Sequence, residues 1–177
     1  MQKKFASRND TAPVRRPVLD LDRHVPYFFT YISNRLSRGA SETYRKHFGL
    51  GITEWRVMGV LAGLPNITAN QVINAIGLDK GAVSRSLGVL EKRQFVKSDP
   101  DPRDKRSRLM RLSQAGEELH DRIIVAALAR EERLLSALSP EEIEGLIICL
   151  RKMRAVVPYV NAYDVENPPP RPGRKKA

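Results

Sequence analysis

Apolar residues recur at spacings of three and four over much of this chain, which is the pattern of amphipathic helices. The first stretch predicts a long helix over residues 22–48, ended by Gly49 and Gly51. Its apolar positions are Val25, Phe28, Phe29, Ile32, Leu36, Ala40, Tyr44 and Phe48. A second helix is predicted to begin at the N-cap Thr53 and to end before Pro65.

Two short helices are predicted next, separated by only a few residues around a glycine. Thr68 is the predicted N-cap of the first short helix, which ends at Gly77, and Asp79 is the predicted N-cap of the second. Each cap has an apolar residue before it and another four residues after it, as in a hydrophobic staple. Two helices at this spacing form a helix-turn-helix.

Two β-prone runs follow the fourth helix, at residues 95–97 and 108–112, on either side of a turn rich in Asp, Pro and Arg. This arrangement predicts a β-hairpin. Ser113 then begins a long amphipathic helix, and residues 139–142, Ser-Pro-Glu-Glu, form a capping box at the start of the last helix. The predicted fold is therefore mainly α, with one small β-hairpin.

Net charge narrows the choice of partner. The 31 Lys and Arg against 20 Asp and Glu give +11 at pH 7, and such an excess favours nucleic acid or an acidic membrane surface. Residues 79–111 hold ten basic and five acidic side chains, so they concentrate the excess of the folded part. A membrane-surface protein would need a basic amphipathic helix, which the pattern does not show. Nucleic acid is therefore the favoured partner.

The fourth helix has two different faces on a helical wheel. Val83, Leu87 and Leu90 fall together and are predicted to face the core. The other face carries small and basic residues, namely Lys80, Gly81, Ser84, Arg85, Gly88 and Lys92. Each glycine costs a helix about 1 kcal/mol relative to alanine, but glycines let the backbone approach a surface closely. Arginine suits guanine in a major groove, so we favour DNA binding over an ordinary solvated face.

Residues 78–119, LDKGAVSRSLGVLEKRQFVKSDPDPRDKRSRLMRLSQAGEEL, resemble the central region of the MarR family of winged helix-turn-helix regulators. The resemblance rests on the D-K-x-x-V-S-R opening of the recognition helix, the L-E-K-R that ends it, and the D-P-R-D-K-R-S wing. It extends over residues 22–158. The family usually has glycine where this chain has Gln94, which makes a left-handed helix end less favourable here.

The resemblance implies a homodimer with a winged helix-turn-helix part and a helical dimerisation region. Residues 53–112 would form the DNA-binding part, and residues 22–50 and 113–158 would supply the intertwined dimerisation helices. Beyond this domain, residues 1–21 and 159–177 are predicted to be flexible basic tails, the second rich in proline.

The resemblance also implies roles for single residues. In the recognition helix, Lys80, Ser84 and Arg85 would contact bases or phosphates. In the wing, Arg103 would enter the minor groove, with Asp101 orienting its guanidinium through a salt bridge. The list of expected DNA-binding residues is Lys80, Gly81, Ser84, Arg85, Gly88, Lys92, Asp101, Arg103 and Arg106, the last on a phosphate.

Similar regulators bind a small effector between the dimerisation helices and the winged domain. Five residues are expected there as an aromatic wall and an anion clamp: Arg38, Tyr44, Arg45, Phe48 and Trp55. This set favours an aromatic acid or its thioester. The alternative is that Trp55 belongs to the core and that both arginines are ordinary surface residues.

Catalytic motifs are missing from the sequence, which has no H-E-x-x-H, no paired C-x-x-C, no G-x-S-x-G and no phosphate-binding loop. The histidines, His24, His47 and His120, are isolated from one another. We therefore expect no enzyme activity, no metal and no cofactor. The single cysteine, Cys149, excludes an internal disulfide, favours a reducing cytoplasm, and is expected to be packed and inert.

The sequence thus predicts a cytoplasmic, sequence-specific regulator of transcription that binds double-stranded DNA. The favoured form is a ligand-responsive repressor that binds a palindromic operator as a homodimer. The alternative is an effector-independent architectural protein of the nucleoid, which would bind DNA with little sequence preference. No run of apolar residues is long enough for a membrane helix, and no membrane partner is expected.

Overall fold

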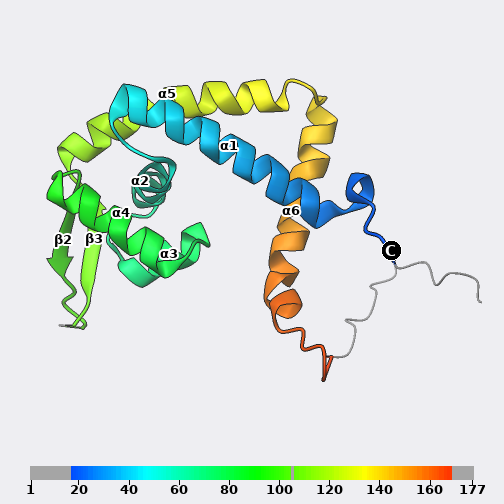
Figure 1. The fold of residues 1–177 in the computed structure, drawn as a ribbon. Coiled ribbons are helices and arrows are strands. Elements are labelled where there is room, and N and C mark those ends of the chain that lie inside the picture. The colour runs from blue at the N-terminus through cyan, green and yellow to red at the C-terminus, as the bar shows by residue number, and fades with distance from the viewer. Residues whose placement is uncertain (1–16, 105, 169–177) are drawn as a thin grey trace, which may run out of the picture. The chain divides into compact units, whose positions relative to one another are not determined.

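The computed structural model describes residues 17–104 and 106–168. Its elements, drawn in Figure 1, are η1 (Leu21–Arg23), α1 (Val25–Phe48), α2 (Ile52–Gly63), β1 (Ile67–Thr68), α3 (Ala69–Ile76), α4 (Lys80–Lys92), β2 (Val96–Pro100), β3 (Arg108–Leu112), α5 (Gln114–Leu135) and α6 (Pro140–Asn161). They form two compact units, one ending at His120 and the other beginning at Asp121.

The predicted fold class is confirmed, because the described chain is mainly helical with one small antiparallel sheet. Strands β2 and β3 form the predicted hairpin, in a register that pairs Val96 with Leu112. The short strand β1 adds a third member in the order β1-β3-β2, pairing Ile67 with Met110. The sequence did not predict β1 because two residues are too few to show an alternating pattern.

Most predicted helix ends are confirmed by their capping geometry. The side-chain oxygens of Thr68, Asp79 and Ser139 each accept a hydrogen bond from the backbone N–H three residues on, at 3.3, 3.0 and 3.2 Å. Gly49 and Gly77 end α1 and α3 with positive φ angles of 69° and 68°. Glycine suits both positions because it has no Cβ to clash in the left-handed region.

The predicted start of α2 is wrong by two residues. Gly51 is the N-cap, and Thr53 lies inside the first turn of the helix. The Glu54 carboxylate accepts a hydrogen bond from Gly51 N at 3.0 Å. Because Glu54 satisfies this N–H from the third helical position, the helix begins earlier than a threonine cap would allow.

The core of the first unit lies where α2, α3 and α4 pack against one another and against the sheet (Figure 1). Its buried residues on these elements are Val57, Met58, Leu61, Val72, Val83, Leu87, Leu90, Val96, Met110 and Leu112. Burial of one face of each short helix stabilises elements that are too short to be stable alone. This packing holds the outer face of α4 towards solvent.

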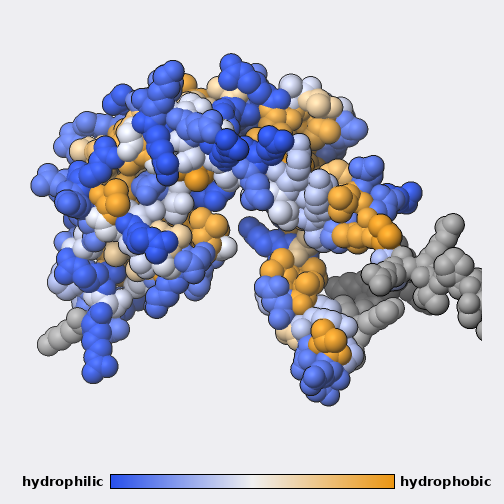
Figure 2. Space-filling view, in the orientation of Figure 1, coloured by the Kyte–Doolittle hydropathy of each residue, from blue (hydrophilic) through white to orange (hydrophobic). Residues whose placement is uncertain are grey.

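The second unit contains most of α5, from Asp121 onward, and all of α6, and no residue of α6 is buried. Hydrophobic side chains are exposed along α6, as Figure 2 shows, and they include Leu146, Ile148, Leu150, Val156, Val157 and Val160. Cys149 is also exposed, so the prediction that it is packed is wrong for the single chain. Its two neighbours in the helix, Ile148 and Leu150, are exposed as well.

The predicted tails fall largely outside the described residues, which begin at 17 and end at 168. Helix α6 continues to Asn161, so it extends into the segment predicted as the C-terminal tail. Within the described part of the chain, every helix is too short or too polar to cross a lipid bilayer.

Candidate nucleic-acid interface

Helix α4 presents two faces, as its sequence predicts. Val83, Leu87 and Leu90 are at most 3% exposed and pack into the core. The opposite face is open to solvent at Lys80, Ser84, Arg85, Gly88 and Lys92, whereas Gly81 is half-buried. Two features of α4 were not predicted, namely that Ser86 is buried and that Val89 is 43% exposed on the outer side.

The two glycines of α4 have different surroundings. A Cβ built on Gly81 would lie 3.0 Å from Asp79 Oδ1 and 3.2 Å from Arg85 Nη1. Glycine at this position therefore leaves space for the side chains of Asp79 and Arg85. A Cβ on Gly88 would meet no atom within 4 Å. Nothing in the described chain therefore accounts for Gly88, which costs the helix about 1 kcal/mol relative to alanine.

Two aspartates bind backbone N–H groups in the described part of the hairpin loop, residues 101–104 and 106–107. Asp101 Oδ1 accepts a hydrogen bond from Arg103 N at 2.9 Å, and Asp104 Oδ1 accepts one from Arg106 N at 2.9 Å. The described contacts include no salt bridge between Asp101 and the Arg103 guanidinium, and the Asp101 carboxylate binds the backbone of Arg103. An aspartate side chain is short, so its carboxylate readily accepts a hydrogen bond from the backbone N–H two residues further on. A contact with the guanidinium would also require the long arginine side chain to be held in place. The backbone N–H groups of Arg103 and Arg106 are therefore each held by an aspartate two residues earlier.

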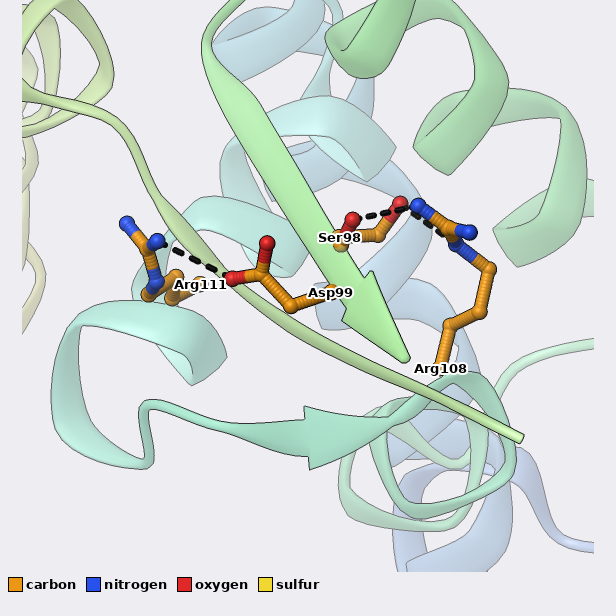
Figure 3. A network of polar contacts seen from close by, with 4 residues as sticks. All are labelled: Ser98, Asp99, Arg108 and Arg111. Atoms are coloured by element: carbon orange, nitrogen blue, oxygen red, sulfur yellow. Dashed lines mark hydrogen bonds and ion pairs between the residues drawn. The ribbon is translucent and has the colours of Figure 1, made fainter. Parts of the chain in front are cut away.

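Two arginines of the hairpin strands were missed by the sequence analysis. Figure 3 shows Arg108 donating hydrogen bonds to both the hydroxyl and the backbone oxygen of Ser98, the first at 2.9 Å. It also shows Arg111 paired with Asp99, with Nη2 and Oδ2 3.0 Å apart. Both arginines cross-link β2 and β3, and the only sequence signal was their position in an alternating strand.

The residues predicted to bind an effector come together in part. Tyr44 is 2% exposed, and its ring centroid lies 6.0 Å from Trp55 and 6.3 Å from Phe48. His120 stacks on Trp55 with ring centroids 5.2 Å apart, a neighbour that the sequence did not indicate. These four residues form an aromatic cluster that joins the end of α1, α2 and the start of α5.

The two predicted clamp arginines are not brought together. Arg38 is exposed and pairs with Glu42 at 3.2 Å. Arg45 lies beside the α1–α2 connection, where its Nε is 3.4 Å from the position of a Cβ on Gly51. An open depression of about 670 Å³ lies elsewhere in the first unit, at the end of α4 and the start of α5, and is lined in part by Arg93 and Gln114.

Helices α3 and α4 with the β2–β3 hairpin make up a winged helix-turn-helix, the class of fold in which one helix and a wing face DNA. A family model described as the MarR family matches residues 48–107. An uncharacterised HTH-type transcriptional regulator, YkoM of Bacillus subtilis, is 33% identical over 107 residues, which span 60% of this chain and 70% of YkoM.

Two solved structures extend the comparison. A MarR/EmrR family transcriptional regulator from Acinetobacter sp. ADP1 is 32% identical, with a TM-score of 0.74 over 80% of this chain and 99% of the other. A mutant MarR from E. coli, solved with operator DNA, shares the fold at 21% identity, with a TM-score of 0.64 over 73% and 92% of the two chains. The chain belongs to the MarR family and is a DNA-binding transcriptional regulator.

Proposed function

We propose that this regulator is a ligand-responsive repressor that binds a palindromic operator as a homodimer. The DNA-binding part of this proposal rests on the outer face of α4, which presents Ser84, Arg85 and Gly88 to solvent. No neighbouring atom in the described chain requires a glycine at position 88. Small residues on this face allow a groove to approach the helix backbone. The E. coli MarR mutant, which has the same fold, was solved with operator DNA.

On this proposal the exposed polar side chains of α4 have separate roles. Arg85 reads a base edge in the major groove, since its planar guanidinium can donate two hydrogen bonds to guanine. Lys80 and Ser84 contact bases or phosphates near the start of the helix. Gly81 and Gly88 permit close approach, and Lys92 binds the phosphate backbone.

The wing supplies the second contact. Arg103 enters the minor groove and Arg106 binds a phosphate, and both are presented by a loop whose backbone Asp101 and Asp104 hold. Asp101 thus acts on Arg103 through the loop backbone. A narrow minor groove has an enhanced negative potential, which attracts an inserted arginine.

Effector binding is proposed at the aromatic cluster of Tyr44, Phe48, Trp55 and His120, with Arg45, which follows Tyr44 on α1, as the cationic group. This chemistry suits an aromatic acid or its thioester, because rings stack on rings and a cation attracts the acid. The single cysteine and the DNA target both favour the cytoplasm as its location. The relatives are transcriptional regulators, and we propose no catalytic activity.

Selection from random DNA duplexes tests the central proposal. We expect an inverted repeat with half-sites about one helical turn, roughly 10 base pairs, apart, because a two-fold dimer presents two recognition helices. A selection that returns no inverted repeat would contradict the operator model and favour an architectural DNA-binding protein.

Arg85→Ala tests the recognition helix within the selected site. We expect it to reduce discrimination at one base pair by about 1–3 kcal/mol. Arg151→Ala, on α6, removes the same charge and is the control. Equal losses at every base pair in both variants would show that Arg85 acts only as a positive charge.

A further inference from the structure

The connection between α1 and α2, residues 49–51, is held to the recognition helix at both of its ends. At one end the Glu54 carboxylate uses both oxygens: Oε2 accepts from Gly51 N and Oε1 accepts from the Ser86 hydroxyl, each at 3.0 Å. Ser86 is 4% exposed and lies on the inner face of α4. Glu54 therefore joins the start of α2 to the middle of α4.

At the other end, Arg93 follows the last residue of α4 and reaches back to the same connection. Its Nη1 donates a hydrogen bond of 2.7 Å to the Gly49 carbonyl oxygen. The guanidinium carbon lies 5.0 Å above the centre of the Phe95 ring, which limits the orientations of the side chain. We call Glu54, Ser86, Arg93 and the backbone of Gly49 and Gly51 the connector clamp.

The space around Gly51 shows how closely the clamp is built. A Cβ on Gly51 would lie 2.7 Å from Glu54 Oε2. Any larger residue must therefore displace the carboxylate that holds Ser86. Between the two attachment points Leu50 is only 1% exposed, so the connection is anchored by packing as well.

Hydrophobic packing alone leaves the orientation of a short helix loosely defined, because apolar contacts have no direction. Hydrogen bonds to fixed backbone and carboxylate oxygens do have direction. The clamp has one bond in the middle of α4 and another just beyond its end. Two separated points of this kind define both the rotation of the helix about its axis and its position along that axis.

We propose that Glu54 and Arg93 are positioning residues for DNA recognition, which fix the orientation of α4 through the connector clamp without contacting DNA themselves. The proposal rests on the proposed use of Arg85 and Ser84 in the major groove. Because Ser86 follows them directly in the same helix, a rotation released at Ser86 moves both side chains. The clamp therefore affects the ratio of specific to non-specific affinity.

Two variants at position 54 separate positioning from charge. Glu54→Ala removes both hydrogen bonds. Glu54→Gln removes the same charge but can accept from Gly51 N with its carbonyl and donate its amide to the Ser86 oxygen. We expect Glu54→Ala to lower affinity for the selected operator about tenfold, with affinity for a scrambled duplex unchanged, and Glu54→Gln to resemble the unmodified protein. Equal behaviour of the two variants would overturn the proposal.

A double-mutant cycle with Ser86→Ala tests the pairing itself. If Glu54 acts through Ser86, the double variant Glu54→Ala/Ser86→Ala loses no more operator affinity than Glu54→Ala alone. Losses that add would overturn this half of the clamp.

Arg93→Ala and Arg93→Lys test the other half by their salt dependence. A positioning role leaves the slope of log affinity against log salt unchanged and allows partial rescue by lysine, which can still reach the Gly49 oxygen. A direct phosphate contact instead reduces the magnitude of the slope by about one in Arg93→Ala, which would overturn the role of Arg93.

Hydrogen exchange of the free protein keeps the test independent of DNA binding. We expect the amides of α4 and Gly51 to exchange faster in Glu54→Ala than in Glu54→Gln, since the clamp orders this region. If the unmodified protein has no preferred DNA sequence, the proposed operator function fails, and the exchange data still decide whether the clamp holds α4. Unchanged exchange in Glu54→Ala would overturn the clamp directly.

Discussion

Gln94 is one of two described residues other than glycine with a positive φ, the second being Asn66, and glutamine favours that conformation less than asparagine does. Gln94 is exposed, immediately follows Arg93, and has a positive φ of 61°. Its carbonyl oxygen accepts a hydrogen bond of 2.6 Å from the Ser113 hydroxyl, so the structure around it maintains this conformation. The left-handed region costs a residue with a Cβ roughly 1–2 kcal/mol.

Gln94→Gly should therefore stabilise the protein by about 0.5–1 kcal/mol, the relief of strain being partly offset by the greater freedom of glycine in the unfolded chain. Denaturant unfolding at one fixed protein concentration measures this difference. Gln94→Ala keeps the Cβ and should bring no such gain. A Gln94→Gly protein less stable than the unmodified one would contradict the strain at this position.

Asp101 provides a second prediction at the scale of one residue. Asp101→Ala removes a negative charge, so simple electrostatics predicts tighter DNA binding. We expect weaker specific binding, because the hydrogen bond that orders the loop around Arg103 is lost. Titrations against operator and scrambled duplexes measure the specific and the non-specific affinity.

Asp101→Asn is the matched control, since it removes the same charge while its side-chain oxygen can still accept from Arg103 N. It should bind the operator as well as the unmodified protein or better. Tighter operator binding by Asp101→Ala would show that the wing acts only as a positive surface.

At the scale of one element, the start of α6 combines a capping box with an acidic first turn. The pKa of Glu141 lies below its ordinary value of 4.5, because its carboxylate accepts hydrogen bonds from its own backbone N–H and from Ser139. A lowered folded pKa means that the ionised carboxylate stabilises the helix end. This contribution is complete above the ordinary pKa and is lost as pH falls through the folded pKa.

An NMR titration of the Glu141 carboxyl should thus show a midpoint below 4.5, with the start of α6 fraying as the group is protonated. Ser139→Ala removes one of the two hydrogen bonds and should move the midpoint upward. A midpoint that does not change in Ser139→Ala would contradict the assigned contact.

At the scale of the whole molecule, the exposed apolar surface is the feature that a single chain does not explain. On α1 it includes Phe28, Phe29 and Ile32, each more than 40% exposed, and on α6 it includes Ile148 and Val157 at 48% each. Monomeric proteins rarely leave large contiguous apolar patches in water. We therefore expect an obligate homodimer through these helices.

Sedimentation velocity at micromolar concentration tests this expectation, and it should show a species of twice the 20.0 kDa chain mass. Replacing Ile148 and Val157 by aspartate should reduce dimer formation. Glu144→Asp, at an exposed charged position of the same helix, should leave dimer formation unchanged. A folded monomer of the unmodified chain would contradict the dimer.

The sequence by itself determined those features whose interactions span three or four residues. The caps at Thr68, Asp79 and Ser139 belong to this group, as does the division of α4 into an apolar and a polar face. They were predictable because the hydrogen bond or the helical period is contained in the local pattern. The wing motif belongs here as well, since its turn residues lie together in the chain.

Only the tertiary structure decided which distant groups meet. The Ser86–Glu54 bond joins residues 32 apart and the Arg93–Gly49 bond residues 44 apart. The stacking of His120 on Trp55 likewise joins groups far apart in the sequence. No local pattern encodes such contacts, because they depend on how α2, α4 and α5 pack once their apolar faces are buried.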